Sequence, residues 1–227
     1  MALPREGDHN RALKAAAEKV LTPLGFWRKG RSRVWLADRG FWLSIVEFQP
    51  SGYSKGSYLN VAAHWLWSPE PDVLSFDYCV ERQKPWIAFE SAAQFEPLAD
   101  HLVRQAAEES RQLSAEITDI PTLASLLTAK HAASAAAGQG GGWPAFHASI
   151  ASGLSGDLAA ARVLFGIAYR SIGAWSPDLQ TLLAPYADAF DKQSSFTKFI
   201  AQRIDEQRSG RGLSPLSPAM NRAMGDK

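Results

Sequence analysis

The stretch FWLSIVEFQPSGYSKGSYLNVAAHWLW, residues 41–67, decides the fold class. Apolar and polar side chains alternate with a period of two on both sides of residues 50–56, a pattern typical of β-strands. The connecting segment PSGYSKG is too short for the crossover that parallel strands require. We therefore predict that residues 41–49 and 57–67 form an antiparallel hairpin.

A helix is expected before this hairpin, over residues 9–22, because apolar side chains recur there at helical spacing. Asp8 is placed to cap this helix, and Pro23 comes where the helix should end. A short strand around residues 34–36 follows. The triplet Asp-Arg-Gly at residues 38–40 is typical of a tight turn that leads into the hairpin.

After the hairpin, two further strands are expected at residues 74–81 and 86–89, and the second half of the chain has helical spacing. The expected helices begin at Pro97 and near Pro121 and cover residues 157–170, 177–184 and 186–208. The sequence therefore predicts an α+β fold. Its order is an N-terminal helix, an antiparallel β-meander of four or five strands, and then a helical C-terminal half.

Composition shifts along the chain predict its domain organisation. The run AASAAAGQGGGWP, residues 132–144, is the clearest break, since glycines favour turns and flexible connections. We expect four parts, which are an α+β domain over residues 1–130, a Gly/Ala-rich linker or loop over 131–145, a helical segment over 146–210 and a loose tail over 211–227.

Length, charge and cysteine content exclude several protein classes. The chain has 227 residues, 46% apolar composition and a formal net charge of +1, so it can bury a core and its global charge favours no particular partner. A single cysteine, Cys79, allows no internal disulfide and suits a reducing cytoplasm. The sequence shows neither a signal core nor a run of apolar residues long enough to span a membrane, so we expect a cytoplasmic protein without a membrane partner.

A set of short motifs in the first half matches a known pattern. They are the L-x-P-L-G-F helix end with its basic residues at Leu21 to Gly30, E-F-Q-P-S at Glu47 to Ser51, the strand Ser57 to Ala63 with Asn60, Cys79 with Arg82, and Ile120-Pro121-x-Leu123. Together they resemble the bacterial family catalogued as domain of unknown function 4304, over roughly the first 128 residues. The resemblance implies a small cytosolic α+β domain, here with an added helical segment. That family has no established activity, so the resemblance assigns no catalytic residue.

The usual catalytic and metal-binding patterns are missing from the sequence. None of the five histidines has another at i+3 or i+4, and a structural zinc site needs about four ligands at close spacings. The segment GLSGD around Ser155 lacks the G-x-S-x-G spacing of a nucleophile elbow. Cys79 with His64 as its base is one catalytic hypothesis, but a lone cysteine on an apolar strand is more typical of a small buried residue. We therefore predict no metal, no cofactor and no catalytic residue.

Glu47 faces an otherwise apolar side of its strand. A half-buried carboxylate of this kind could act as an acid or a base. It could equally pair with one of the cations in the preceding segment, which are Arg28, Lys29 and Arg33. We favour the ion pair, because these cations are adjacent in the meander.

The stretch GFWRKGRSRVW, residues 25–35, combines four cations with three aromatic residues. Nucleic-acid binding would place Arg31 and Arg33 on one exposed face, with exposed rings for base stacking. The other interpretation has the aromatic side chains packed inward and the cations capping the helix end, where its dipole favours them. The small net charge favours this second interpretation.

The leading hypothesis is a non-catalytic cytosolic domain that binds another protein, as an immunity or antitoxin-like partner or as a subunit of a complex. Six of the eight tryptophans precede residue 90, and such residues dominate interface energetics. The predicted binding residues are Arg31, Arg33, Gln49, Tyr53, Asn60, His64, Trp65 and Trp67. The alternatives are a nucleic-acid-binding protein that uses residues 25–35, or an unrecognised enzyme with a site on the sheet, in which Glu47, His64 and Asp77 would converge in a deep pocket.

Overall fold

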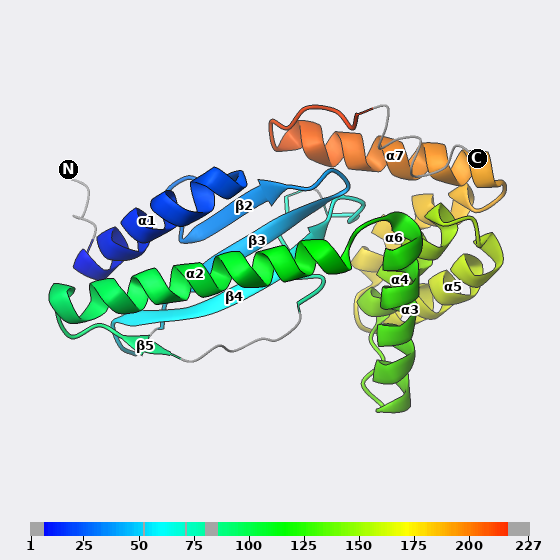
Figure 1. Ribbon diagram of the computed structural model, residues 1–227. Coiled ribbons are helices and arrows are strands. Elements are labelled where there is room, and N and C mark those ends of the chain that lie inside the picture. Colours follow the sequence, from blue (N-terminus) through cyan, green and yellow to red (C-terminus); the bar gives the residue numbers. More distant parts are fainter. Residues whose placement is uncertain (1–6, 52, 71, 80–85, 218–227) are drawn as a thin grey trace. The chain divides into compact units, whose positions relative to one another are not determined.

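The computed structural model describes residues 7–51, 53–70, 72–79 and 86–217 (Figure 1). It has the predicted α+β class, with an N-terminal helix, a five-stranded antiparallel sheet and then helices. The chain divides into two compact units. The first, here the sheet unit, comprises Met1–His64 and Tyr78–Ala115, and the second, the helical unit, comprises Trp65–Asp77 and Glu116–Lys227.

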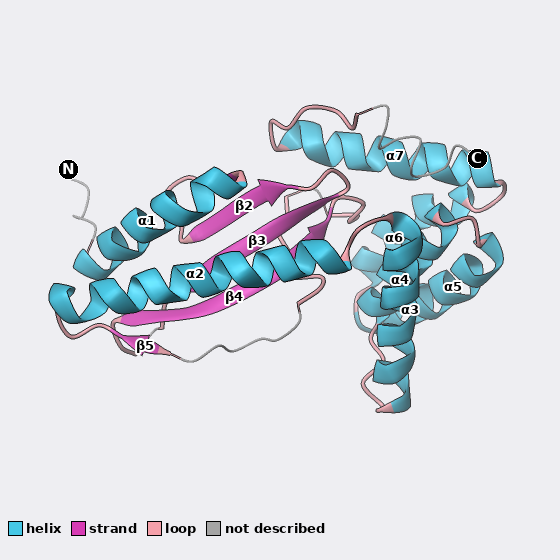
Figure 2. Cartoon of the chain, viewed as in Figure 1, coloured by secondary structure: helices cyan, strands magenta, loops and turns pink. Residues whose placement is uncertain are grey.

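The sheet unit is a β-meander covered by two helices. Its strands are hydrogen-bonded in chain order, and they are β1 (Phe26–Arg28), β2 (Val34–Asp38), β3 (Trp42–Gln49), β4 (Gly56–Trp65) and β5 (Ile87–Ala88). The helices α1 (Asp8–Leu21) and α2 (Ala92–Glu116) lie side by side over the sheet (Figure 2), and a 3₁₀ turn, η1 (Thr22–Leu24), follows α1. A hydrogen bond of 2.8 Å between the hydroxyls of Ser44 and Ser110 joins β3 to α2 inside the core.

The fourth predicted strand, at residues 74–81, does not form in the part of the chain that the structure describes, and its last two residues lie outside that part. Tyr78 forms an isolated antiparallel bridge with Ala63. Two residues further along β4, the N–H of Trp65 donates to the Asp77 carboxylate at 2.8 Å. A side chain therefore takes the place of the next backbone acceptor, and the ladder stops. The strand at Phe26–Arg28 was not expected; it pairs with β2.

Two helix starts also differ from expectation. The N-cap of α1 is Gly7, and the Asp8 side chain pairs with Arg11 within the first turn. Pro97 lies inside α2, which begins at Ala92. The prediction that Asp8 caps the first helix and that Pro97 lies in the first turn of the next was wrong. The expected helix start at residue 177 is confirmed, since Ser176 caps α6 and Pro177 is its first residue.

The helical unit packs around one buried helix. Its elements are α3 (Ile120–Ala136), α4 (Gly142–Leu154), α5 (Leu158–Trp175), α6 (Pro177–Ala189) and α7 (Gln193–Gly210). The helix α4 packs against both α3 and α5, and its Phe146 ring lies 5.2 Å from the ring of Tyr186 on α6. The expected linker over residues 131–145 contains the end of α3 and the start of α4, so only residues 137–141 connect two helices.

The domain limits expected from the sequence, with a first domain that ends at residue 130, stay a prediction. The compact units change at residues 115 and 116 instead, and the segment Trp65–Asp77 belongs to the helical unit. Part of the expected tail is ordered against α7. Leu216 is buried, and its N–H donates to the Asp205 carboxylate at 2.8 Å. Residues 218–227 lie outside the described residues.

We expect Gly153→Ala to lower the free energy of unfolding by about 1–3 kcal/mol, the cost of overpacking a core. Gly153 lies in α4, and a Cβ there would come within 2.4 Å of the buried Phe196 ring on α7. In other helical positions alanine instead gains about 0.5–1 kcal/mol over glycine. Gly166→Ala, on α5, is the matched control, because its nearest neighbour is a flexible arginine end at 3.4 Å. Urea denaturation should give opposite signs for the two variants, and stabilisation by both would contradict the close approach of α4 and α7.

Candidate functional site

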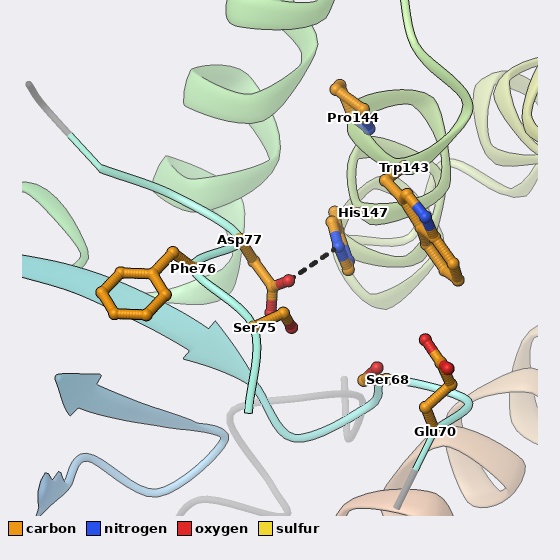
Figure 3. A pocket seen from close by; sticks show the side chains of 8 residues that line it. All are labelled: Ser68, Glu70, Ser75, Phe76, Asp77, Trp143, Pro144 and His147. Atoms are coloured by element: carbon orange, nitrogen blue, oxygen red, sulfur yellow. Dashed lines mark ion pairs between the residues drawn. The ribbon is translucent and has the colours of Figure 1, made fainter. Parts of the chain in front are cut away.

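A cavity of about 300 Å³ lies within the helical unit (Figure 3). It forms between the segment Trp65–Asp77 and the first two turns of α4. The lining residues are Ser68, Glu70, Ser75, Phe76, Asp77, Trp143, Pro144 and His147. The cavity therefore combines two carboxylates, two hydroxyls, an imidazole and an indole.

Local sequence explains how α4 presents its part of this lining. Pro144 lies in the first turn of α4, where its missing N–H leaves no intrahelical bond unmade. Trp143 and His147 are four residues apart, so they share one face of the helix. Their ring centroids are 6.1 Å apart with planes inclined by 23°, an offset stack. This stacking orients the imidazole toward the opposite wall.

The opposite wall is held by hydrogen bonds from α6 and α7. The Tyr186 hydroxyl donates to the Trp67 carbonyl at 2.7 Å, and the Gln207 amide donates to the Ser68 carbonyl at 2.9 Å. The rings of Trp65 and Trp67 stack at 5.3 Å with an angle of 12°. Although this segment is irregular, these contacts fix its path through the helical unit.

Asp77, His147 and Trp67 form a buried polar cluster at the back of the cavity. The Asp77 Oδ1 and His147 Nε2 atoms are 3.4 Å apart, and their side chains are 7% and 5% exposed. The Trp67 Nε1–H donates to His147 Nδ1 at 3.3 Å. An indole can only donate, so Nδ1 must offer its lone pair and the imidazole is the neutral tautomer with its proton on Nε2. That proton faces the Asp77 carboxylate.

This arrangement leaves His147 without a free proton acceptor. Both ring nitrogens are engaged, and Trp67 and Asp77 are its polar partners among the described residues. A histidine that activates a serine must accept the hydroxyl proton on a free ring nitrogen. Ser68 and Ser75 line the cavity, but neither can pass a proton to His147 in this state. In this state His147 therefore cannot act as the base of an acyl-transfer reaction.

Glu70 completes the cavity from the loop after Ser68. Its carboxylate points upward toward the α4 side of the cavity in Figure 3. Within the described ranges it makes no recorded hydrogen bond or ion pair, whereas its neighbour Pro69 accepts a hydrogen bond of 3.5 Å from Arg203. That arginine also donates to Glu206. Glu70 is therefore a partly buried acceptor at the cavity wall.

The structure brings three of the sheet residues singled out in the sequence together, and none of them lines this cavity. Asn60 donates to Glu47 at 3.0 Å and to Gln49 at 2.8 Å across β3 and β4. The expected ion pair of Glu47 was wrong for the described residues, because Arg33 instead donates to the Gly56 carbonyl at 3.0 Å. Glu47 thus has a neutral partner.

Some of the remaining predicted binding residues are exposed to solvent, and others are buried in the core. Tyr53 is fully exposed and Arg31 is exposed, whereas His64, Trp65 and Trp67 are completely buried. The buried three cannot touch a partner in this conformation. Of the three residues expected to converge in an enzyme's pocket, only Asp77 lines the cavity, and Glu47 and His64 are not among the lining residues.

The basic–aromatic stretch at residues 25–35 does not present rings for stacking. Phe26 and Trp35 are each 3% exposed, as the inward-packing interpretation predicts, and Trp27 is partly buried. The Arg28 guanidinium donates to the carbonyls of Arg31 and Ser32, at 2.9 Å and 2.6 Å. It therefore stabilises the turn between β1 and β2 rather than the end of α1, where we expected the cations to act.

Sequence reasoning missed the residues of α4 that build the site. In the sequence His147 is one of five scattered histidines, and Trp143 belongs to the Gly-rich run of residues 132–144. The i, i+4 spacing of these two residues was the available signal, and it gains meaning only once α4 is known to be a helix. Glu70 stands between two prolines, and no motif there predicts a binding residue.

Within the described ranges, no helix combines the length and the apolar character needed to cross a membrane. The same residues contain no grouping of three or more histidine, cysteine, aspartate or glutamate side chains that could hold a metal ion. No protein-family model, curated protein or solved structure matches the chain, so the fold and the site are interpreted from their own geometry.

Proposed function

We propose that the chain is a non-catalytic cytoplasmic protein that binds another protein, as an immunity or antitoxin-like partner or as a subunit of a complex. The engagement of both His147 ring nitrogens carries this proposal. It leaves a shaped, polar cavity that has binding groups but whose histidine cannot accept a proton. Such a cavity supports recognition better than turnover.

Exposed apolar side chains on the helical unit support a macromolecular partner. Val163 and Trp175 are 66% and 62% exposed on α5, and Ile167 lies one turn after Val163. The side of α5 opposite Val163 buries Phe165 and Ala168, whereas Trp175 is the last residue of the helix. Exposed tryptophan and aliphatic side chains of this kind are typical of protein contacts.

The resemblance to the family catalogued as domain of unknown function 4304 is kept as part of the proposal. It rests on motifs in the first half of the chain, one of which, Arg82, lies outside the described residues. Membership would be consistent with a binding protein, since the resemblance assigns no catalytic residue. It does not by itself favour any particular partner.

A pull-down of the full chain from its native cells, read by mass spectrometry, tests the proposal. We expect one protein partner in stoichiometric amount with the wild type. Val163→Asp combined with Trp175→Ala should reduce its recovery at least tenfold. Leu98→Asp, on α2, makes a comparable change at another exposed apolar residue and should retain the partner.

Two results would contradict the proposal. One is recovery of no stoichiometric partner by a wild-type chain that gel filtration shows to be folded and monomeric. The other is a wild-type chain that associates only with itself, which would make the exposed face of α5 an interface between two copies. Equal recovery by all variants would contradict the assignment of α5 to the interface.

A further inference from the structure

We propose that the cavity of the helical unit binds a guanidinium group, presented by an arginine side chain of the partner protein. This inference rests on the proposed function, and it adds the chemistry of the group that is recognised. The cavity, its charges and its aromatic wall each contribute an argument.

Charge is the first argument. The residues that line the cavity include two carboxylates, Glu70 and Asp77, and neither lysine nor arginine. His147 does not neutralise them, because the Trp67 N–H requires the neutral imidazole. A cation placed between the two carboxylates is attracted by both, and burial strengthens this attraction relative to bulk water. The lining therefore selects positive over negative or neutral ligands.

Hydrogen-bonding capacity is the second argument. A guanidinium group carries five N–H donors in one plane and no acceptor. The cavity offers acceptors from Glu70 and Ser68 on one segment, while the Asp77 carboxylate on another already accepts from the Trp65 N–H and faces His147 Nε2 (Figure 3). Glu70 has no recorded partner within the described part of the chain. A planar, multidentate donor thus matches the lining better than a compact ammonium group does.

The aromatic wall is the third argument. Trp143 lines the cavity and stays partly exposed, although its ring also stacks on His147. Indole rings attract cations, and guanidinium groups prefer to lie flat against such rings. The volume of about 300 Å³ is at the lower end of small-molecule pockets, which suits a single inserted side chain.

The test compares two probes that differ in charge and hardly in shape. N-acetyl-arginine methylamide carries the guanidinium, and N-acetyl-citrulline methylamide replaces it with a neutral urea. NMR of the indole N–H of Trp143 in the full chain reports binding. We expect saturable shifts with the arginine probe and at least tenfold weaker binding of the citrulline probe.

Glu70→Gln supplies the matched change in the protein. The Glu70 carboxylate makes no hydrogen bond or ion pair with the described residues, so this variant should fold normally. We expect its affinity for the arginine probe to be at least tenfold lower than that of the wild type. Glu96→Gln, at an exposed position on α2, should leave binding unchanged. Equal binding of both probes, or arginine binding that is indifferent to Glu70→Gln, would overturn the inference.

The two proposals can fail separately. If the wild type and Glu70→Gln capture the same partner equally well, the guanidinium site is overturned while the protein-binding function stands. The arginine probe could instead bind with the expected dependence on Glu70 while no protein is captured. That result would overturn the proposed function, and with it the claim that the guanidinium belongs to a partner protein. The cavity would then take a free guanidinium compound.

Discussion

Replacement of Trp67 by alanine is expected to lower the free energy of unfolding by about 3–5 kcal/mol, as for other large buried aromatic residues. The Trp67 side chain is fully buried and stacks on Trp65. Its N–H also fixes the tautomer of His147 across the back of the cavity. Alanine removes both the packing and the hydrogen bond, so the loss should exceed that of an ordinary surface change. Urea denaturation followed by circular dichroism measures it.

Trp67→Phe separates the two contributions. It keeps an aromatic ring in the core but removes the donor to His147 Nδ1, and an unmade buried hydrogen bond costs about 1–3 kcal/mol. In this variant His147 Nδ1 loses its donor, so the NMR shift of that ring nitrogen should change. A loss equal to that of Trp67→Ala, with an unchanged NMR shift of His147 Nδ1, would contradict the donor role of Trp67.

The effect of Tyr186→Phe on the free energy of unfolding is expected to change sign with pH. Burial raises the pKa of Tyr186 to about 12, although its contact with Arg203 acts in the opposite direction. At neutral pH the variant loses the hydrogen bond to the Trp67 carbonyl, so it should be less stable by about 1 kcal/mol. Above pH 10, where the unfolded tyrosine ionises and the folded one does not, the wild type loses about 1.4 kcal/mol per pH unit.

The sign follows from proton binding. A pKa that is raised on folding gives stability that is fully present below the unfolded pKa and is lost as pH rises through the folded pKa. Phenylalanine lacks this contribution, so the two proteins should become equally stable near pH 11, and the variant should be the more stable one above it. Urea denaturation at pH 8, 10 and 11.5 measures the difference. Parallel curves for wild type and variant would exclude a buried, neutral Tyr186.

Tyr53→Phe is the control for the pH series. The Tyr53 side chain is fully exposed in the folded protein, so the folded and unfolded environments of its hydroxyl are alike. We expect this variant to follow the wild-type curve throughout. A shift as large as that of Tyr186→Phe would mean that the alkaline effect does not come from the helical unit.

The sheet was predictable because its information is local. Alternation over residues 41–49 and 57–67 and a seven-residue connection were enough to predict β3, β4 and their pairing. The contact between Asn60 and Glu47 across β3 and β4 was not predicted, because it depends on the register between the two strands. The first helix was predictable from its apolar spacing.

The site was not predictable because its information is non-local. The helix α4 has the sequence GWPAFHASIASGL and is buried on nearly all sides, so it lacks the polar face that reveals an amphipathic helix. Glycine and proline at its start are typical of a turn or a connection rather than of a helix. His147 meets Trp67 across 80 residues of sequence, and no spacing rule connects two such positions. Neither charge nor composition predicts that Glu70 lines a cavity.

The division of the helical unit into Trp65–Asp77 and Glu116–Lys227 has a consequence for the order of synthesis. Trp65 and Trp67 leave the ribosome long before α4 exists. At about 5–20 residues per second, the 80 residues up to His147 take roughly 4–16 s to translate. During that interval the Trp67 ring on the nascent chain lacks the helix whose His147 it later contacts. The segment Trp65–Asp77, which forms one wall of the cavity, is thus synthesised several seconds before α4, which forms the other. Chaperones can bind this segment during that time.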